Sequence, residues 1–396
     1  MTAADSLPPP APETLKALFL LDPEVHFLNH GSFGATPQPV FAARQHWLER
    51  LERQPVKFLA RDFAELMHTA RHALAAWLGC AGDDLVYVAN ATFGVNLVAR
   101  SLHLAAGDEV LSSDHEYGAC ERAWQAACAT AGARYVRQPI AFPATSAEAM
   151  LEQLWQGVTP RTRAIFISHI SSPTALRLPV EAICARARAA GLTTVIDAAH
   201  SVGQLPLDLG RLDADFVVGN LHKWALAPKS AAFLYARRER QADLVPLAVS
   251  WDSGGVPGGS TGSRFIDQLQ WTGTHDPSPA LAVPAALAFM AEHRWPAVGA
   301  ACHARLQRLL ADIAALTGLP PCYPPDSQQF AQMGVAELPA GVDPARLQAR
   351  LYDDWRVEVP LLDWHGRKLI RISLQAYNTA ADGEALLQGL AHLLPR

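Results

Sequence analysis

The sequence predicts an α/β protein in which a large domain, with a mostly parallel sheet flanked by helices, precedes a smaller α+β C-terminal domain. Short apolar runs alternate with amphipathic helical patterns between about residues 85 and 236, as in parallel strands joined by crossover helices. A Gly/Ser/Pro-rich segment from Ser253 to Ser263 ends the alternation. We therefore expect an N-terminal arm over 1–21, the large domain over 22–277 and the small domain over 278–396.

The expected elements follow one another in a regular order. A turn-rich stretch, Asn29 to Gly34, precedes helical patterns across roughly 40–54 and 61–79. Ligands of open α/β sheets gather at the carboxyl ends of the strands, so we expect the site there. The expected strands of the large domain are LVYVA near 85, EVLSS near 109, ARYV near 133, RAIFIS near 163, TTVIDA near 193, DFVVGN near 215 and AAFLYA near 231.

The last part of the chain has a different pattern. From about residue 280 we expect long helices, then VAEL as a strand, a helix from Pro344, the strands VEVP and LIRISL, and a final helix. This mixture is typical of a small α+β domain. The segment Ser253–Ser263 is expected to be a loop that forms a wall of the site.

Composition narrows the class of function. Half of the 396 residues are hydrophobic, and the net charge of -5 is spread along the chain, so we expect neither a nucleic-acid nor a membrane partner. The first residues lack the pattern of a secretory signal and no apolar run reaches spanning length, so we expect a cytoplasmic protein. Six scattered cysteines without a CxxC pair argue against a disulfide framework or a metal site.

The most informative pair of residues is Asp197 and Lys223. Asp197 ends one apolar strand, and Lys223 follows another. Chemistry with pyridoxal 5'-phosphate (PLP) needs such a pair: an amine that forms a Schiff base, and a carboxylate that keeps the pyridine nitrogen protonated. Each residue alone has an ordinary explanation, because a lysine after a strand is usually solvated and an aspartate often caps a helix.

Seven motifs extend this interpretation along most of the chain: NATFGVN, SSDHEYGA, SHISSPTA, DAAH, GNLHKWALAPKSAAFL, WTGTHDPS and RISLQAYN. In this order they resemble the class V aminotransferase family of fold-type I PLP-dependent enzymes. GNLHKWALAPKSAAFL resembles the isopenicillin N epimerase-like branch of that family. The resemblance implies a fold-type I PLP-dependent transferase-like architecture, with Lys223 as the Schiff-base lysine and Asp197 as its pyridine-binding acid.

Further residues receive cofactor-binding roles. Ala91 and Thr92 stand between a strand and a helix, where backbone N–H groups and a hydroxyl can hold a phosphate, although Thr92 also suits an ordinary cap. The resemblance implies that His115 stacks on the pyridine ring. It implies that His200 contacts the ring hydroxyl or the phosphate, and that His222 binds the phosphate. Each of these histidines also suits a structural position.

The resemblance also assigns substrate and partner contacts. Arg371 is expected to hold the substrate carboxylate through a bidentate fork, and Ser172 to line the same part of the site. Asn29 and Gly31 belong to the stretch up to Gly34 that is expected to close over the substrate. Thr274 is expected to reach the phosphate of a second copy, which implies a homodimer with shared active sites.

The sequence leaves the reaction branch open. Cysteine desulfurases share this scaffold but carry a cysteine shortly before the arginine, where this chain has VEVPLLDWHGRKLIRIS with Trp364 and His365, and the nearest upstream cysteine is the distant Cys322. Persulfide formation is therefore not expected. Four aromatic residues are expected either to form a substrate pocket or to lie in the core, namely Phe33, Trp251, Trp271 and Trp364.

Epimerisation of an amino acid through a carbanion is the first expectation. It needs proton transfer on both faces of the carbanion, by Lys223 on one face and by His115, Tyr117 or a held water on the other. A β-eliminating carbon–sulfur lyase is the runner-up, and aminotransfer is third. A non-enzymatic scaffold is the alternative from another class, and the combination of Asp197, Lys223 and Arg371 argues against it.

Overall fold

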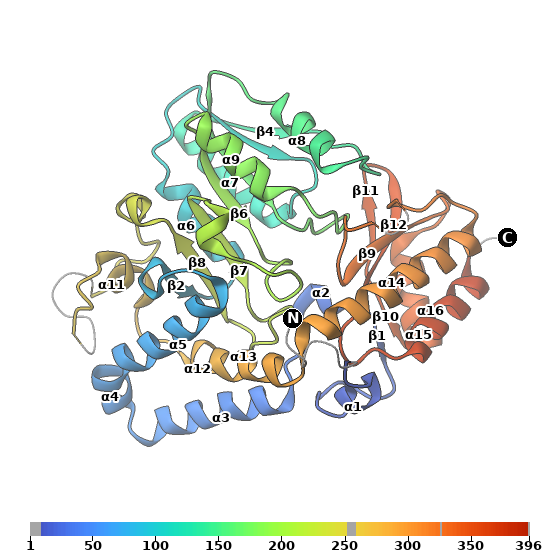
Figure 1. The fold of residues 1–396 in the computed structure, drawn as a ribbon, viewed down its shortest axis with the longest axis horizontal. Coiled ribbons are helices and arrows are strands. Elements are labelled where there is room, and N and C mark those ends of the chain that lie inside the picture. Colours follow the sequence, from blue (N-terminus) through green and yellow to red (C-terminus); the bar gives the residue numbers. More distant parts are fainter. Residues whose placement is uncertain (1–8, 252–258, 325–326, 395–396) are drawn as a thin grey trace.

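The computed structural model describes residues 9–251, 259–324 and 327–394. A seven-stranded sheet forms its centre (Figure 1). All seven strand segments expected in the large domain are confirmed. In spatial order the strands are β2 (Leu85–Val88), β8 (Ala232–Ala236), β7 (Phe216–Asn220), β6 (Thr193–Asp197), β5 (Thr162–Ser168), β3 (Glu109–Ser113) and β4 (Arg134–Gln138).

The sheet is mostly parallel, as expected, with one strand reversed. Strands β7, β6, β5, β3 and β4 pair in parallel, whereas β8 is antiparallel to both β7 and β2. The reason lies in residues 221–231, which join β7 to β8 without a helix. A parallel return would need a crossover connection, so this short loop turns the chain back beside β7. The loop carries Lys223.

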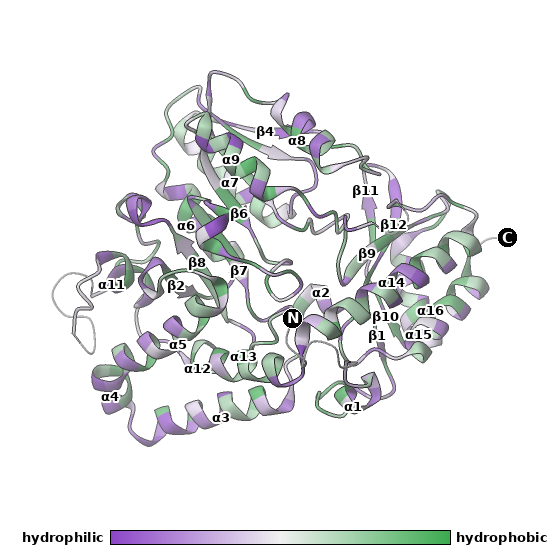
Figure 2. Cartoon of the chain, viewed as in Figure 1, coloured by the Kyte–Doolittle hydropathy of each residue, from purple (hydrophilic) through white to green (hydrophobic). Residues whose placement is uncertain are grey.

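Helices cover both faces of this sheet, so its strands are buried on both sides except at the edge strand β4, which is partly exposed. Phe166 of β5 packs with Trp124 on one face, while its neighbours Ile165 and Ile167 belong to the apolar cluster on the other face. Figure 2 shows hydrophobic residues concentrated around β6, β7 and β8. The covering helices include α6 (Ala91–Ser101), α7 (Gly118–Ala131), α8 (Ala147–Trp155), α9 (Val180–Ala189), α10 (Leu209–Leu212) and α11 (Arg264–Gln270), with 3-10 turns η3 (Gly82–Asp84) and η4 (Arg238–Asp243).

Two long helices precede the sheet, close to the predicted spans. They are α3 (Gln38–Arg53) and α5 (Phe63–Leu78), joined through α4 (Pro55–Lys57) and a π-helical turn, η2 (Phe58–Asp62). Ahead of them lie α1 (Pro12–Lys16) and a single helical turn, α2 (His30–Phe33), in the stretch expected to be irregular. The predicted arm over 1–21 lies partly outside the described residues.

The C-terminal part contains a small antiparallel sheet (Figure 1, right). Its order is β11 (Leu361–Trp364), β12 (Arg367–Ser373) and β9 (Met333–Leu338). The strand β11 was not expected, whereas β9, β12 and β10 (Val357–Glu358) confirm VAEL, LIRISL and VEVP. β10 pairs in parallel with β1 (His26–Phe27). The helices are α12 (Ser278–Leu281), α13 (Val283–Glu292), α14 (Trp295–Thr317), α15 (Pro344–Trp355) and α16 (Ala380–Leu393).

Two further expectations concern segments rather than elements. The domain boundaries at 21 and 277 stay predictions. Of the Gly/Ser/Pro-rich segment Ser253–Ser263, residues 253–258 lie outside the described residues. Among the described residues, no helix is both long enough and apolar enough to cross a bilayer.

The turn α2 is fixed against the loop that carries Lys223. Lys229 donates from Nζ to the carbonyl oxygen of Gly34 at 2.9 Å. Gly34 has a φ of 70°, and a Cβ at this position would lie 2.0 Å from the carbonyl oxygen of His222. Such a contact excludes every other residue type unless the backbone moves. The turn is thus closely packed against this loop, and the expectation that residues 29–34 close over the substrate stays a prediction.

We predict that Gly34→Ala destabilises the protein more than Gly107→Ala. Gly107 has a φ of 87°, but a Cβ at this position would meet nothing within 4 Å, so alanine there costs only the backbone strain of roughly 1–2 kcal/mol. At Gly34 the clash adds about 1–3 kcal/mol. Chemical unfolding of both variants measures the difference, and equal losses would contradict the close packing of α2.

Candidate active site

A cavity of about 560 Å³ lies at the carboxyl ends of β5, β6 and β7. This is the edge of the sheet at which the sequence placed the site. The structure brings most of the predicted site residues together there and leaves out Asn29, His115 and Thr274. Those that line the cavity are Gly31, Ala91, Thr92, Ser172, Asp197, His200, His222, Lys223 and Arg371.

Lys223 projects its amine into this cavity. The loop after β7 places its Nζ 3.3 Å from Nε2 of His200. Burial lowers the pKa of this amine to about 8, an effect that Asp197 opposes and Arg371 reinforces. About a tenth of the amine is therefore unprotonated at pH 7, far more than for an exposed lysine, and an unprotonated amine is the form that acts as nucleophile or base.

The hydrogen bonds of His200 favour that neutral amine. Trp224 donates from Nε1 to Nδ1 of His200 at 3.3 Å, and an indole nitrogen can only donate. Burial, and then the charge of Lys223, hold the pKa of His200 well below its ordinary value, so the ring is neutral. Its single proton must then lie on Nε2, which faces the amine as a donor. An ammonium group at this position would meet another donor.

Asp197 supplies a buried carboxyl beside the lysine. It is 4% exposed, and its Oδ1 accepts the backbone N–H of Ala199 at 2.8 Å. Burial raises its pKa, whereas the hydrogen bond from Ala199 and the charge of Lys223 lower it. A carboxylate in this position suits a protonated ring nitrogen, because the pair would neutralise each other out of water.

Two groups near Asp197 were missed by the sequence reasoning. Cys120 of α7 donates from Sγ to Oδ2 of Asp197 at 3.6 Å. Glu116 accepts from Ser113, and from the backbone and hydroxyl of Ser168, which pairs with Asp197 in the sheet. Burial raises the pKa of Glu116 to about 8, and the charge of Asp197 adds to this. No spacing in the sequence indicated either contact.

A phosphate would find donors among other residues that line the cavity. The N-terminus of α6 points there, with Asn90 capping it through the N–H of Phe93 at 2.8 Å, and Thr92 lines the cavity. The buried Nδ1 of His222 has no partner in the described chain, and burial lowers the pKa of this ring to about 4. An orphaned ring nitrogen and a helix N-terminus that line one cavity fit an anionic group.

Ala91 corrects one detail of the predicted phosphate site. Its backbone N–H donates to Oδ1 of Asn220 at 2.8 Å, so this N–H already has a partner. Asn220 ends β7 and lines the cavity itself. It was not a sequence candidate, although it stands only three residues before the lysine.

Arg371 is a buried cation without an acidic partner in the described chain. It is 5% exposed and donates from Nη1 to the carbonyl and hydroxyl oxygens of Ser172, at 2.6 and 3.1 Å. From Nη2 it donates to the hydroxyl of Ser32 at 3.2 Å, and its Nε has no partner among the described residues. Burial lowers the pKa to about 10, which leaves the group charged at neutral pH. Such a site suits a carboxylate brought by a ligand.

His115 does not lie in the cavity, which corrects the expected stacking position. Its side chain is fully buried, with Nδ1 2.7 Å from the hydroxyl of Thr174 and Nε2 2.9 Å from the carbonyl oxygen of Ile140. Its ring lies 4.6 Å from that of Trp364. The motif SSDHEYGA correctly indicated that the loop after β3 contributes to the site, but it did not show which side chain points into the cavity. Tyr117, not His115, lines the cavity.

Asn29 and Thr274 lie outside the cavity for different reasons. Asn29 donates to Glu358 at 3.0 Å and accepts from Ser32, so it supports a residue that touches Arg371. Thr274 is exposed, and its predicted contact with a second copy stays a prediction. Among the four aromatic residues considered for a substrate pocket, only Phe33 lines the cavity. Trp271 packs with Phe63 in the interior, Trp364 packs on His115, and Trp251 is exposed.

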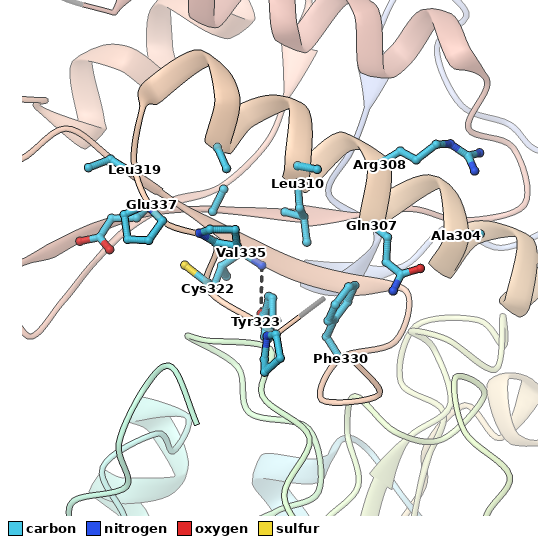
Figure 3. A pocket seen from close by; sticks show the side chains of 16 residues that line it. Ala304, Gln307, Arg308, Leu310, Leu319, Cys322, Tyr323, Phe330, Val335 and Glu337 are labelled. Carbon is cyan, nitrogen blue, oxygen red and sulfur yellow. Dashed lines mark hydrogen bonds between the residues drawn. The ribbon is translucent and has the colours of Figure 1, made fainter. Parts of the chain in front are cut away.

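A second cavity, of about 400 Å³, lies between α14 and β9 (Figure 3). Leu310, Phe330 and Val335 form part of its wall, and the hydroxyl of Tyr323 there accepts the N–H of Val335 at 3.1 Å. Cys322 also lines it, but burial raises the pKa of that thiol to about 11, so the nucleophilic thiolate is disfavoured. The chemistry-bearing residues therefore lie in the Lys223 cavity.

The chain is similar to known proteins over most of its length. Isopenicillin N epimerase of Amycolatopsis lactamdurans is 37% identical, in an alignment that covers 94% of this chain and 96% of that protein. Putative L-cysteine desulfhydrase 1 of Oryza sativa subsp. japonica is 28% identical, in an alignment that covers 93% of this chain and 83% of that protein.

Solved structures share the fold. The cystine C–S lyase C-DES, in a complex with its reaction product cysteine persulfide, matches with a TM-score of 0.82 at 22% identity, and 94% of this chain and 99% of that chain are covered. The model of the family described as aminotransferase class-V matches residues 27–386. The chain therefore belongs to the class V aminotransferase family and is a PLP-dependent enzyme.

Proposed function

We propose that the protein inverts the configuration of an amino acid at its α-carbon, as an epimerase or racemase. The observation that carries this proposal is the position of two proton carriers along the sheet. Lys223 follows β7 and Tyr117 follows β3, with β6 and β5 between them, and both residues line the cavity. Asp197 ends β6, between the strands that Lys223 and Tyr117 follow, so a ring held by Asp197 would lie between the two strand ends that carry these residues.

Each chemical group of the cofactor would be bound by a residue of matching chemistry. We assign the covalent link to Lys223, the ring nitrogen to Asp197, the ring hydroxyl to His200, and the phosphate to His222 together with Thr92. When bound, PLP would withdraw electrons from the α-carbon and make its proton acidic. The orphaned Nδ1 of His222 supports the phosphate assignment.

The remaining residues would orient the substrate and move its proton. Arg371 would hold the carboxylate, with Ser172 and Ser32 keeping the guanidinium plane in place. This fixes which bond at the α-carbon faces the lysine. The unprotonated amine of Lys223, beside Nε2–H of His200, would accept a proton on one side. The phenol of Tyr117 would return a proton on the other side.

A carbon–sulfur lyase is the second candidate function. The relationship to the putative desulfhydrase, at 28% identity over 93% of this chain, favours it. The loop from β11 to Arg371 contains no cysteine, so a lyase here would expel sulfur by β-elimination. Isopenicillin N epimerase is more similar, at 37% identity, which supports the ranking.

Two further assignments belong to this proposal. We propose a homodimer in which Thr274, exposed in this chain, contacts the phosphate in the partner's cavity. We also propose a cytoplasmic location.

The reaction is tested with the purified holoenzyme and a panel of L-amino acids and cysteine conjugates in deuterated water. We expect α-deuterium incorporation accompanied by the D-configured product for at least one substrate, without keto acid. Release of pyruvate or another keto acid without inversion would assign the lyase or aminotransferase reaction instead. Lys223→Ala is the control and should abolish turnover.

Tyr117→Phe tests the second proton carrier. We expect inversion to fall by about 10²-fold or more, because a positioned acid or base contributes about 10²–10⁴-fold. Deuterium exchange with retention of configuration should persist, because Lys223 still exchanges the proton on its own side. Chiral chromatography coupled to mass spectrometry separates the two rates. Unchanged inversion would remove Tyr117 from the mechanism.

The lowered pKa of Lys223 predicts how capture of PLP by the apoenzyme depends on pH. Only the unprotonated amine attacks the aldehyde, so the capture rate should rise with pH and reach half its maximum near pH 8, the pKa that burial produces. An exposed lysine would place the midpoint at about 10.4. Stopped-flow absorbance measures the rate, with a blocked lysine peptide as the control. A midpoint near that of the peptide would contradict the buried amine.

A further inference from the structure

His30 lies directly behind the active lysine, outside the cavity. Its side chain is fully buried, and its Nε2 lies 3.0 Å from the backbone carbonyl oxygen of Lys223. Its Nδ1 lies 2.8 Å from the hydroxyl of Tyr377, and its ring packs at 5.0 Å on that of Trp224. The imidazole thus joins the lysine backbone to the C-terminal part of the chain.

The partners of His30 define its proton. Its Nε2 lies 3.0 Å from the carbonyl oxygen of Lys223, which can only accept, and 3.4 Å from the amide Nε2 of Gln375. The shorter contact assigns the ring hydrogen to Nε2, where it bonds to Lys223. In the neutral ring Nδ1 is then an acceptor, and the hydroxyl of Tyr377 donates to it. Burial lowers the pKa of His30 to about 3, so the ring is neutral at neutral pH.

The same helical turn also contacts the substrate-binding arginine. Ser32, two residues after His30, accepts from Nη2 of Arg371 and donates to Asn29. Gly31 lies between them against the C-terminal sheet, where a Cβ would come within 2.8 Å of Met333 and Ser373. The turn therefore has little freedom to shift, and it connects the backbone of Lys223 with the guanidinium of Arg371.

We propose that His30 is a positioning residue that fixes the main chain of Lys223 relative to Arg371, so that the amine meets the cofactor aldehyde and the α-carbon of a substrate held by its carboxylate. The substrate part of this inference rests on the proposed function, whereas the aldehyde part does not. Leu226 also donates to the same carbonyl oxygen, at 3.2 Å, but it belongs to the lysine's own loop. Of these two donors, only His30 also connects that oxygen to Tyr377.

Two substitutions separate positioning from simple filling of the core. In His30→Gln the side-chain Nε2 is as many bonds from Cβ as the imidazole Nε2, so it can still donate to Lys223. His30→Asn is too short to do so. Tyr377→Phe keeps the imidazole and its bond to Lys223 but removes the hydroxyl that fixes the tautomer.

The readout is capture of PLP by the apoenzyme, compared with the affinity for pyridoxine 5'-phosphate, which has no aldehyde for the amine. We expect His30→Asn to slow capture by about 10–100-fold, since a misplacement of about 1 Å costs up to about 10²-fold. His30→Gln should stay within threefold of the wild type, and Tyr377→Phe should fall between them. Affinity for pyridoxine 5'-phosphate should change by less than threefold in all three.

The results support or overturn the inference independently of the reaction catalysed. Wild-type capture by His30→Asn would overturn it, and so would equal loss in His30→Gln and His30→Asn accompanied by loss of pyridoxine 5'-phosphate binding. If His30→Asn does not fold, wild-type capture by Tyr377→Phe overturns the inference. For a substrate, His30→Asn should lower kcat for α-deuterium exchange while KM stays within threefold, because Arg371 still binds the carboxylate.

Discussion

The site depends on the burial of the Lys223 amine, whose positive form is only partly stabilised by the charged groups around it. Burial removes the hydration that favours the ammonium form, and Arg371 adds a second positive charge nearby. Asp197 opposes both effects, and the pKa of the amine is about 8 as a result. The sheet makes this possible, because β6 and β7 are adjacent and deliver the acid and the lysine to one edge.

The histidines around the lysine are neutral for the same reason. Burial lowers the pKa values of His30, His200 and His222, so none of them adds a competing charge. Each then acts through a defined donor or acceptor atom. His200 directs a donor at the amine, His30 holds the backbone behind it, and the unpartnered nitrogen of His222 remains available to an anion. The permanent positive charge is left to Arg371.

The sequence predicted the strands and the residues at their ends better than the direction of side chains in loops. The apolar runs became strands of one sheet, and all of them except the edge strand β4 are almost fully buried. Asp197 and Lys223 were found because strand ends determine where they lie. The prediction that His115 lines the cavity was wrong, because the side chains of a loop after a strand can point in either direction. Contacts with Thr174 and Ile140 hold the His115 ring in the interior. The reversal of β8 was missed, although no helical pattern separates it from β7.

Other features depend on contacts between distant segments. No sequence spacing relates certain residues to the partners that they contact at the site, so only the folded chain shows these contacts. These residues are His30, Ser32, Cys120 and Asn220. Asn29 was expected to touch the substrate but instead supports Ser32, because Glu358 of β10 binds its amide. Such residues shape the site by positioning other side chains. Sequence motifs identify mainly the residues expected to contact a ligand directly.

The central claim is that Lys223 carries the cofactor. Reduction of the holoenzyme with borohydride, followed by peptide mass spectrometry, tests it directly, because reduction makes the link between the lysine and the cofactor permanent. The account predicts the phosphopyridoxyl mass on the peptide containing Lys223. It also predicts no such mass on Lys229, whose amine is bonded to Gly34 in the same loop. Modification of Lys229 or of any other lysine in place of Lys223 would contradict the account.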